Sequence, residues 1–572
     1  MTSTLTSLHN RILVKQVDQY GNLQPVSALE NNSIRPVPVR DRTWTQLTYA
    51  LFWFSATSNV SNLYAASTGM TEGLTMWEAI VCSLSGQFLA GFLIAVNGRA
   101  GAIYRIPFPV LCRSSFGTWG AIWPTFNRAC MSIVWNGVNS VQGAQCLYVC
   151  LHAIFPSIEN IPDKMGTKSA LTSAQMMCFF IYCNGKAYDY DRILNCAFLV
   201  IPVPKMKGLV YAKVAIFFSA VFGMIGWTVC LAGNPTSALN QPSTVSGSTK
   251  SWVICKFLFL GLASCGTFIS NAADFQRYAK RPNNVILGQV IGFPLSNFIV
   301  AVCGNVIAAA GKGIFGELIW NPLTLLDKLM EGERYTHANR AGCALISLAF
   351  VYASISSAIF ENSIPAGNDI ASLLPKYITI KRGFFICAVL SYAICPWYLL
   401  SSAAVFINFL SSYQIFLSAI AGILICDYYL IRRGYLDIPL LYIGSQKENY
   451  YYYTYGFNIR AFVAYLVPVA IHFYGFLNQL GVSAPMGIQR FYYVAYPTGL
   501  LIAFGLYYLF CIWFPFSGMV DKALGWKEPQ DYSDENHLGR ITEEGIVSDG
   551  VDVVTQEANV EKGQDASEKR IF

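Results

Sequence analysis

The chain has 572 residues, of which 54% are hydrophobic, 15% aromatic and only 12% charged. A soluble globular protein carries about 25% charged residues, so this composition cannot cover a water-facing surface and indicates a protein that crosses a membrane several times. It excludes a secreted disulfide scaffold, a nucleic-acid binder and an ordinary cytosolic enzyme. The net charge of +7 is less informative than its placement, because Lys and Arg collect in cytoplasmic loops.

The cysteines and histidines predict neither a metal site nor a cofactor. Seventeen Cys are scattered through apolar segments without a CxxC pair, and only five His occur, so the usual zinc spacings are absent. Cys in an apolar run is usually a small buried hydrophobic residue. A membrane-embedded enzyme would need a convergent cluster, whereas His152 and His472 are isolated, so we predict that the chain is not an enzyme.

Both ends of the chain are predicted to be cytosolic tails. Residues 1–43 are polar and rich in Arg, without a cleavable signal peptide. Residues 519–572 are acidic and polar, which is typical of a disordered segment. Tail lysines make the ubiquitin ligase machinery a candidate partner, although solvated tail lysines are common; these are Lys522, Lys527, Lys562 and Lys569.

Between the tails, residues 44–518 are predicted to form one membrane domain of about twelve helices, each near the 20 apolar residues that span a bilayer. The candidate spans are 46–69, 74–97, 119–153, 172–183, 209–232, 252–272, 284–311, 340–364, 384–399, 401–426, 460–482 and 495–515. Basic residues gather in alternate connections, such as Arg99–Arg113 and Arg277–Arg281, which places both termini in the cytoplasm.

The fourth span does not continue as an apolar helix. Residues 183–192 place four charged side chains where it should cross the bilayer. A charge at the bilayer centre costs at least about 2.5 kcal/mol on insertion scales. Either a loop interrupts the helix, or part of 183–199 is translated intron. Sequencing the transcript decides between these two hypotheses.

Two spans carry polar interruptions at matching positions. Residues 55–62 interrupt the first span, and residues 264–274 interrupt the sixth. Irregular backbone inside a membrane is tolerated where it lines a cavity. Because each of these spans opens a group of five, the pattern is typical of a secondary transporter with inverted repeats. The alternative is that small residues merely let helices pack closely.

The third span offers an aromatic residue beside an amide. Trp135 and Asn139 are four residues apart, so a helix places them on one face. This pair suits a planar heterocycle with amide-like edges, because the ring can stack and the amide both donates and accepts. Alternatively, Trp135 packs against lipid or a neighbouring helix and Asn139 bonds across helices.

The eighth span carries hydroxyls and a carboxylate. Ser356 and Ser357 can offer oxygens to a small cation, and Asn362 follows about 1.5 turns later. Glu361 either carries a coupling proton or lies near the water-filled end of the helix. The residues 365–369 suggest that this end is close.

At these residues the sequence resembles a fungal member of the nucleobase–cation symporter-1 family, in the uracil, uridine and allantoin permease branch. The similarity runs from about Thr43 to Phe516 and includes Asn97–Tyr104, Phe108–Gly117, Phe126–Arg128, Asp274–Tyr278, Ala366–Asp369, Leu373–Tyr377 and Cys395–Trp397. It implies an all-α integral membrane protein with a LeuT-type five-plus-five inverted repeat and two further C-terminal helices.

The resemblance also implies a substrate site. In the family, the substrate is held by four side chains: an aromatic and an amide of the third helix, an aromatic of the sixth helix and an Asn of the eighth. The corresponding residues here are Trp135, Asn139, Cys265 and Asn362. Asn139 replaces the usual Gln. A thiol at Cys265 cannot supply a second stacking face, and Phe268, one turn further on, is the candidate substitute.

The cation site of the bacterial relative corresponds to Ala353, Ser356 and Ser357. Fungal members are generally coupled to H+, so the resemblance favours H+ over Na+. Glu361 falls where relatives tend to have a small residue, which makes it a candidate for the proton.

These observations predict a multi-pass plasma-membrane permease that imports uracil, uridine or allantoin by proton symport, with the lipid bilayer and a small heterocycle as its partners. Two alternatives remain open. The altered pocket could take a vitamin such as thiamine or nicotinamide riboside, whose cationic ring would give Glu361 a direct role. Loss of the aromatic at Cys265 would also suit a nutrient sensor that binds without transporting.

Overall fold

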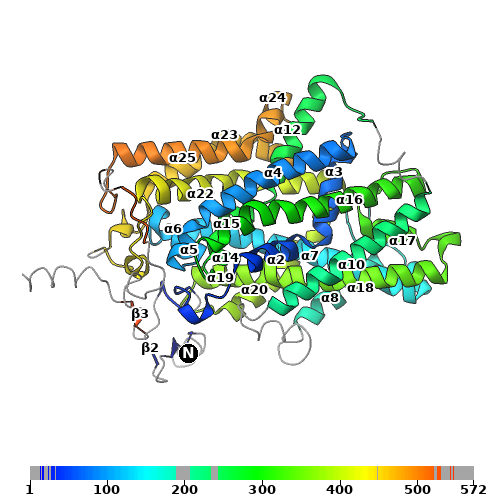
Figure 1. Cartoon of the computed structure of the whole chain (residues 1–572), viewed down its shortest axis with the longest axis horizontal. Coiled ribbons are helices and arrows are strands. Elements are labelled where there is room, and N and C mark those ends of the chain that lie inside the picture. Colours follow the sequence, from blue (N-terminus) through cyan, green and yellow to red (C-terminus); the bar gives the residue numbers. More distant parts are fainter. Residues whose placement is uncertain are drawn as a thin grey trace, which may run out of the picture.

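A computed structural model of the chain describes residues 13–14, 16–17, 23–24, 28–31, 34–187, 207–233, 242–446, 449–520, 523, 525–529, 541–542 and 545–546. Over these residues the fold is a bundle of mostly long helices (Figure 1). The prediction of an all-α protein is confirmed. The described strands are two short antiparallel pairs outside the bundle: β1 (Gln16–Val17), β2 (Leu23–Gln24), β3 (Ile541–Thr542) and β4 (Gly545–Ile546).

Seven helical stretches among the described residues are long and apolar enough to cross a membrane. They are Met76–Asn97, Gly208–Ala232, Asn284–Phe315, His337–Leu373, Ala403–Ile431, Ile459–Gln479 and Ala495–Trp513. The other predicted spans are broken, shorter or more polar. The count of about twelve spans therefore stays a prediction.

The first span is broken in the middle, as the sequence predicts. It consists of α2 (Gln46–Thr57) and α3 (Val60–Thr71). The amide oxygen of Asn59 accepts from the backbone N–H of Asn62 at 2.9 Å and so caps the start of α3. A polar cap thus replaces the backbone hydrogen bonds that a continuous helix would make here.

The sixth span is broken as well. It consists of α12 (Gly247–Ala263), α13 (Gly266–Ser270) and α14 (Ala272–Gln276), which meet at Cys265 and at Asn271. The matching interruptions of the first and sixth spans are therefore confirmed.

The remaining α-helices connect or surround these two broken spans. In chain order they are α4 (Met76–Asn97), α5 (Arg99–Tyr104), α6 (Phe108–Phe116), α7 (Ile122–Ile154), α8 (Ser173–Ala187), α10 (Lys207–Ala232), α15 (Asn284–Leu287), α16 (Phe293–Phe315), α17 (Pro322–Lys328), α18 (His337–Ser357), α19 (Ile364–Leu373), α20 (Ile380–Ala393), α21 (Ala403–Ser412), α22 (Gln414–Cys426), α23 (Ile459–Gln479), α24 (Met486–Tyr493) and α25 (Ala495–Trp513).

The eighth span is longer than predicted. A π-helical turn at Ala358–Ser363 joins α18 to α19, and the helix continues to Leu373. The prediction that it ends near Pro365 is wrong. Pro365 lies in the first turn after the π-helical turn, where the ladder of backbone bonds already changes register and a missing N–H is tolerated.

Small residues bring helices close around the broken spans. Gly304 of α16 lies against the backbone of Leu63 in α3, and Gly86 of α4 lies against the backbone of Leu258 in α12. A side chain at either glycine would overlap a carbonyl oxygen, so these contacts require glycine.

The bundle has two ends (Figure 1). We call the end with residues 34–44, α5, α6 and residues 432–458 the N-terminal face, and the end with α17 and α24 the distal face. Part of the predicted N-terminal tail lies on the N-terminal face, where the carbonyl of Ile34 accepts from the hydroxyl of Tyr442 at 2.7 Å. The division into tails and one domain stays a prediction.

The predicted interruption of the fourth span can be compared with the structure only at its start. Helix α8 continues through Ala187. Residues 188–199, most of the segment for which we proposed an intron origin, lie outside the described residues, as do Lys522, Lys562 and Lys569 of the C-terminal tail.

Candidate functional site

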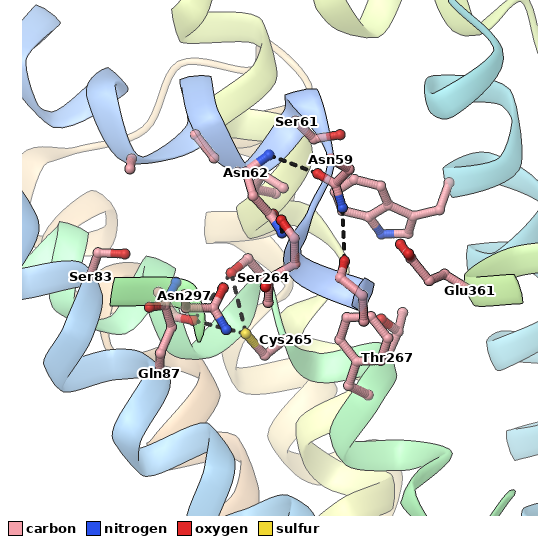
Figure 2. A pocket seen from close by; sticks show the side chains of 18 of the residues that line it. Asn59, Ser61, Asn62, Ser83, Gln87, Ser264, Cys265, Thr267, Asn297 and Glu361 are labelled. Carbon is pink, nitrogen blue, oxygen red and sulfur yellow. Dashed lines mark hydrogen bonds between the residues drawn. The ribbon is translucent and has the colours of Figure 1, made fainter. Parts of the chain in front are cut away.

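A central cavity lies between the two broken spans, α4, α7, α16 and the π-helical turn of the eighth span (Figure 2). It contains about 1200 Å³ of empty space, its mouth included, and extends from the middle of the bundle toward the distal face. Every residue predicted to contact a substrate lines it: Trp135, Asn139, Cys265, Phe268 and Asn362. Glu361 lines it too.

One part of this cavity combines an aromatic ring with two amides. The half-buried indole of Trp135 packs against the ring of Phe409, with 5.4 Å between the centroids. Asn139 is only 3% exposed, yet its side chain has no hydrogen-bond partner among the described residues. Asn362 donates weakly to the carbonyl of Ser357, at 3.4 Å. Buried amides normally form hydrogen bonds, so a ligand or water is expected to supply the partners that these two side chains lack.

The sixth span contributes a thiol and a phenyl ring. Cys265 lies at the break between α12 and α13, with its sulfur 3.3 Å from the carbonyl of Gly261. Phe268, one turn further on, lines the cavity and meets the ring of Trp53 edge to face at 5.3 Å. A ring is thus present near the position where the resemblance requires one, but the stacking role of Phe268 stays a prediction.

Lys213, which is fully buried in α10, was not among the predicted site residues. Its ammonium donates to the carbonyl of Ser55 in the last turn of α2 at 2.6 Å, to the hydroxyl of Ser357 at 2.7 Å and to the carboxylate of Glu361 at 2.7 Å. The missed signal was a Lys inside an apolar span, since an intramembrane charge indicates function by default. Nor does Glu361 lie at a helix end, because it is 8% exposed in the middle of the eighth span.

The residues expected to surround a cation differ in their contacts. Ser357 accepts from Lys213, whereas the hydroxyl of Ser356 donates to the carbonyl of Tyr352 in its own helix at 2.9 Å. Ala353 is buried with 0% exposure. The side-chain nitrogen of Lys213 therefore contacts one hydroxyl that was expected to surround a small cation, that of Ser357, and also the carbonyl of Ser55.

A second cavity extends toward the N-terminal face. It lies between α2, the start of α10, the end of α14, the π-helical turn of the eighth span and the start of α19. Two residues line both cavities, Ala56 and Glu361. Among the residues described, Glu361 is therefore the titratable side chain that both cavities reach.

A second buried ion pair lies closer to the N-terminal face. The guanidinium of Arg128 in α7 pairs with the carboxylate of Asp369 in α19, and both side chains are at most 2% exposed. The amide of Asn271, at the second break of the sixth span, donates to the carbonyl of Thr267 at 2.7 Å and accepts from Arg128. Both charged residues lie in motifs that carry the family resemblance, Phe126–Arg128 and Ala366–Asp369, but no role was predicted for them.

A polar group that was not predicted lies on the side of the central cavity away from Glu361. It consists of Ser83 and Gln87 in α4 and Asn297 in α16. In Figure 2 these three side chains lie beside Ser264 and Cys265, and Glu361 lies at the other end. Polar residues within the otherwise apolar second and seventh spans were the available signal.

Comparisons with known proteins agree with this architecture. Residues 36–499 match the family model described as permease for cytosine/purines, uracil, thiamine and allantoin. The uridine permease of Saccharomyces cerevisiae is 35% identical over 538 residues, which cover 92% of this chain and 82% of that protein. The allantoin permease of the same yeast is 34% identical over 501 residues, covering 86% of this chain and 77% of that protein.

The fold itself is found in a solved transporter. The inward-facing structure of Mhp1, a nucleobase-cation-symport-1 family transporter, matches with a TM-score of 0.67 and 20% identity, covering 87% of this chain and 97% of that one. The expected LeuT-type architecture is confirmed by this match.

Proposed function

Because the chain belongs to the family of permeases for cytosine/purines, uracil, thiamine and allantoin, we propose that it imports uracil, uridine or allantoin across the plasma membrane together with a proton. The members of this family are multi-pass membrane transporters, so the chain is a permease and not an enzyme. One observation carries the proposal: a single cavity joins the Trp135 ring and two buried amides to the carboxylate of the Lys213–Glu361 ion pair.

The proposed binding mode follows from the chemistry of a planar heterocycle. Its ring stacks on Trp135, which excludes water from both surfaces. Its carbonyl and N–H edges face Asn139 and Asn362, whose amides can both donate and accept. Neither amide is fully bonded within the protein, which supports this assignment. No covalent step is required, and no cofactor is expected.

The coupling ion is proposed to be H+ rather than Na+. Lys213 places its side-chain nitrogen against the oxygens of Ser55 and Ser357, so a sodium ion would have to displace it. Glu361 can instead accept a proton, which removes its negative charge and weakens its bond to Lys213. Since Ser55 belongs to the first broken span, this change alters a contact between that span and α10.

Transport then follows from the positions of the two cavities. We propose that Glu361 takes its proton from the central cavity and releases it to the second cavity, because it lines both. The substrate moves in the same direction, from the central cavity toward the second cavity, when the broken helices move relative to their neighbours.

The proposed orientation places the N-terminal face in the cytoplasm. Basic side chains of this face include Arg99, Arg113 and Arg432, as the positive-inside rule requires of cytoplasmic segments. Ubiquitination of tail lysines remains part of the proposal and is consistent with a cytoplasmic C-terminus.

The vitamin alternative loses its main structural argument. Glu361 already pairs with Lys213 at 2.7 Å, so it does not require a cationic ring as a partner. A non-transporting sensor is tested directly by accumulation.

The test is uptake of radiolabelled uracil, uridine, allantoin, thiamine and nicotinamide riboside in a yeast strain lacking its own permeases, with and without a protonophore. We expect at least one of the first three to accumulate against its gradient and the protonophore to abolish accumulation. Trp135→Ala should weaken uptake about tenfold, because stacking on an aromatic ring contributes roughly 1–3 kcal/mol per base. Normal surface expression without accumulation of any of the five would refute the proposal.

A further inference from the structure

We propose that the polar group formed by Ser83, Gln87 and Asn297 is a sugar subsite, so that the preferred substrate is a nucleoside whose ribose extends past Cys265. This inference rests on the proposed function and specifies its substrate class. It uses the part of the cavity that the stacking ring and the two amides leave unoccupied (Figure 2).

The polar group faces the cavity from two helices. Ser83 and Gln87 are four residues apart in α4, so they lie on one face with about 6 Å of rise between them. That face meets the sixth span, since Gly261 of α12 contacts the backbone of Ser83. Asn297 joins from α16, where its amide nitrogen donates to the carbonyl of Phe293 at 2.9 Å.

These side chains retain unused hydrogen-bonding capacity. Neither the hydroxyl of Ser83 nor the amide of Gln87 has a partner among the described residues, and the Oε1 atom of Gln87 is buried. The Oδ1 atom of Asn297 likewise has no partner in this part of the chain, although Asn297 is only 6% exposed. Several unsatisfied polar groups in the interior of a membrane domain indicate a polar ligand.

Cys265 connects this polar group to the rest of the cavity. Its neighbour Ser264 donates to the carbonyl of Gly261 at 3.1 Å, and both residues line the cavity beside Asn297. A thiol is much smaller than the aromatic residue that the family resemblance predicts at this position. Cys265 therefore leaves space between the Trp135 ring and the polar group. An aromatic side chain at this position would fill that space.

The donors and acceptors match a ribose. Each sugar hydroxyl both donates and accepts, and an amide offers one group of each kind, so Gln87 and Asn297 can bind neighbouring hydroxyls. All three side chains are uncharged, which favours a neutral sugar over a phosphate. A nucleoside is therefore preferred over both a free base and a nucleotide.

The test compares uptake of labelled uridine, 2′-deoxyuridine and uracil by the full-length protein in the same permease-deficient yeast. We expect uridine to show the lowest KM and 2′-deoxyuridine a severalfold higher one. Gln87→Leu and Asn297→Leu should each raise the KM for uridine about tenfold, the effect of losing one or two hydrogen bonds, and change that for uracil less than twofold. Cys265→Trp should reduce uridine uptake by more than tenfold and spare uracil.

Ser85→Ala provides the matched control, because Ser85 lies on α4 between the two subsite residues and its hydroxyl bonds only the carbonyl of Val81, at 2.8 Å. It should leave uptake of all three compounds unchanged. If uracil is taken up, but uridine is neither taken up nor able to compete with uracil, the sugar subsite is overturned and the proposed function stays intact. Equal losses for uridine and uracil in both leucine variants would also overturn the sugar subsite. Accumulation of allantoin without uptake of uridine or uracil would likewise overturn only the sugar subsite. Failure to accumulate any of uracil, uridine, allantoin, thiamine and nicotinamide riboside would refute the proposed function itself.

Discussion

Two buried ion pairs of the helix bundle, Lys213–Glu361 and Arg128–Asp369, resemble each other in position but not in chemistry. Lys213–Glu361 and Arg128–Asp369 each join the eighth span to another helix, and each contacts one broken span, through Ser55 in the first case and Asn271 in the second. An arginine stays charged at every physiological pH, whereas a carboxylate that two cavities reach can exchange a proton. We infer that the arginine pair fixes the helices and that the lysine pair responds to the proton.

The largest effect should come from breaking the arginine pair. Arg128→Met leaves Asp369 as an isolated buried charge, which costs about 3–5 kcal/mol. We expect loss of folded, surface-located protein, measured by size-exclusion chromatography of a fluorescent fusion and by confocal imaging.

The control for this first prediction is the double variant Arg128→Met with Asp369→Leu. It removes both charges and should recover part of the folded protein, since well-packed apolar pairs can replace buried ion pairs. Full stability of the single variant would show that the arginine pair does not fix the helices.

The second prediction separates folding from coupling. Glu361→Gln keeps an oxygen that accepts from Lys213 but removes the titratable group. Surface expression should exceed that of Arg128→Met, because the amide oxygen still accepts from Lys213. The accumulation ratio of the substrate should fall to about 1, since a proton gradient can no longer drive uptake. Exchange of internal for external substrate should persist. Protonophore-sensitive accumulation by this variant would assign the proton to another residue.

The third prediction concerns the ammonium of Lys213. Lys213→Ala leaves three oxygens around a vacated space, contributed by Ser55, Ser357 and Glu361, which suit a small hard cation. We expect uptake to become stimulated severalfold by millimolar Na+ and to lose its dependence on the proton gradient. Uptake assayed in sodium and in choline buffers measures the difference. Equal rates in the two buffers at normal surface expression would mean that the ammonium does not stand in for a cation.

The smallest effect should distinguish two neighbouring hydroxyls. Ser357→Ala removes one hydrogen bond to the ammonium, and bonds to charged groups contribute about 1.5–3 kcal/mol, so uptake should fall about tenfold. Ser356→Ala removes only a bond within its own helix and should change uptake less than twofold. Initial rates, corrected for surface protein, provide the comparison. Equal losses of uptake in both variants would contradict this prediction, which rests on the different contacts of the two hydroxyls.

The sequence by itself determined much of the architecture. Apolar stretches of bilayer length predicted the spans, and the polar interruptions near Ser58 and Cys265 predicted two broken helices, because backbone groups in a membrane must be bonded or line a cavity. The spacing of Trp135 and Asn139 placed an aromatic and an amide on one face of α7, since helical periodicity is local.

Only the tertiary structure decided how distant charges pair. Lys213 and Glu361 are 148 residues apart, and Arg128 and Asp369 are 241 apart, so no local pattern links them. The end of the eighth helix was also beyond local rules, because a π-helical turn accommodates Pro365 where propensity predicts a stop. Which polar side chains share a cavity depends on how helices pack, and this packing places Ser83, Gln87 and Asn297 beside Cys265.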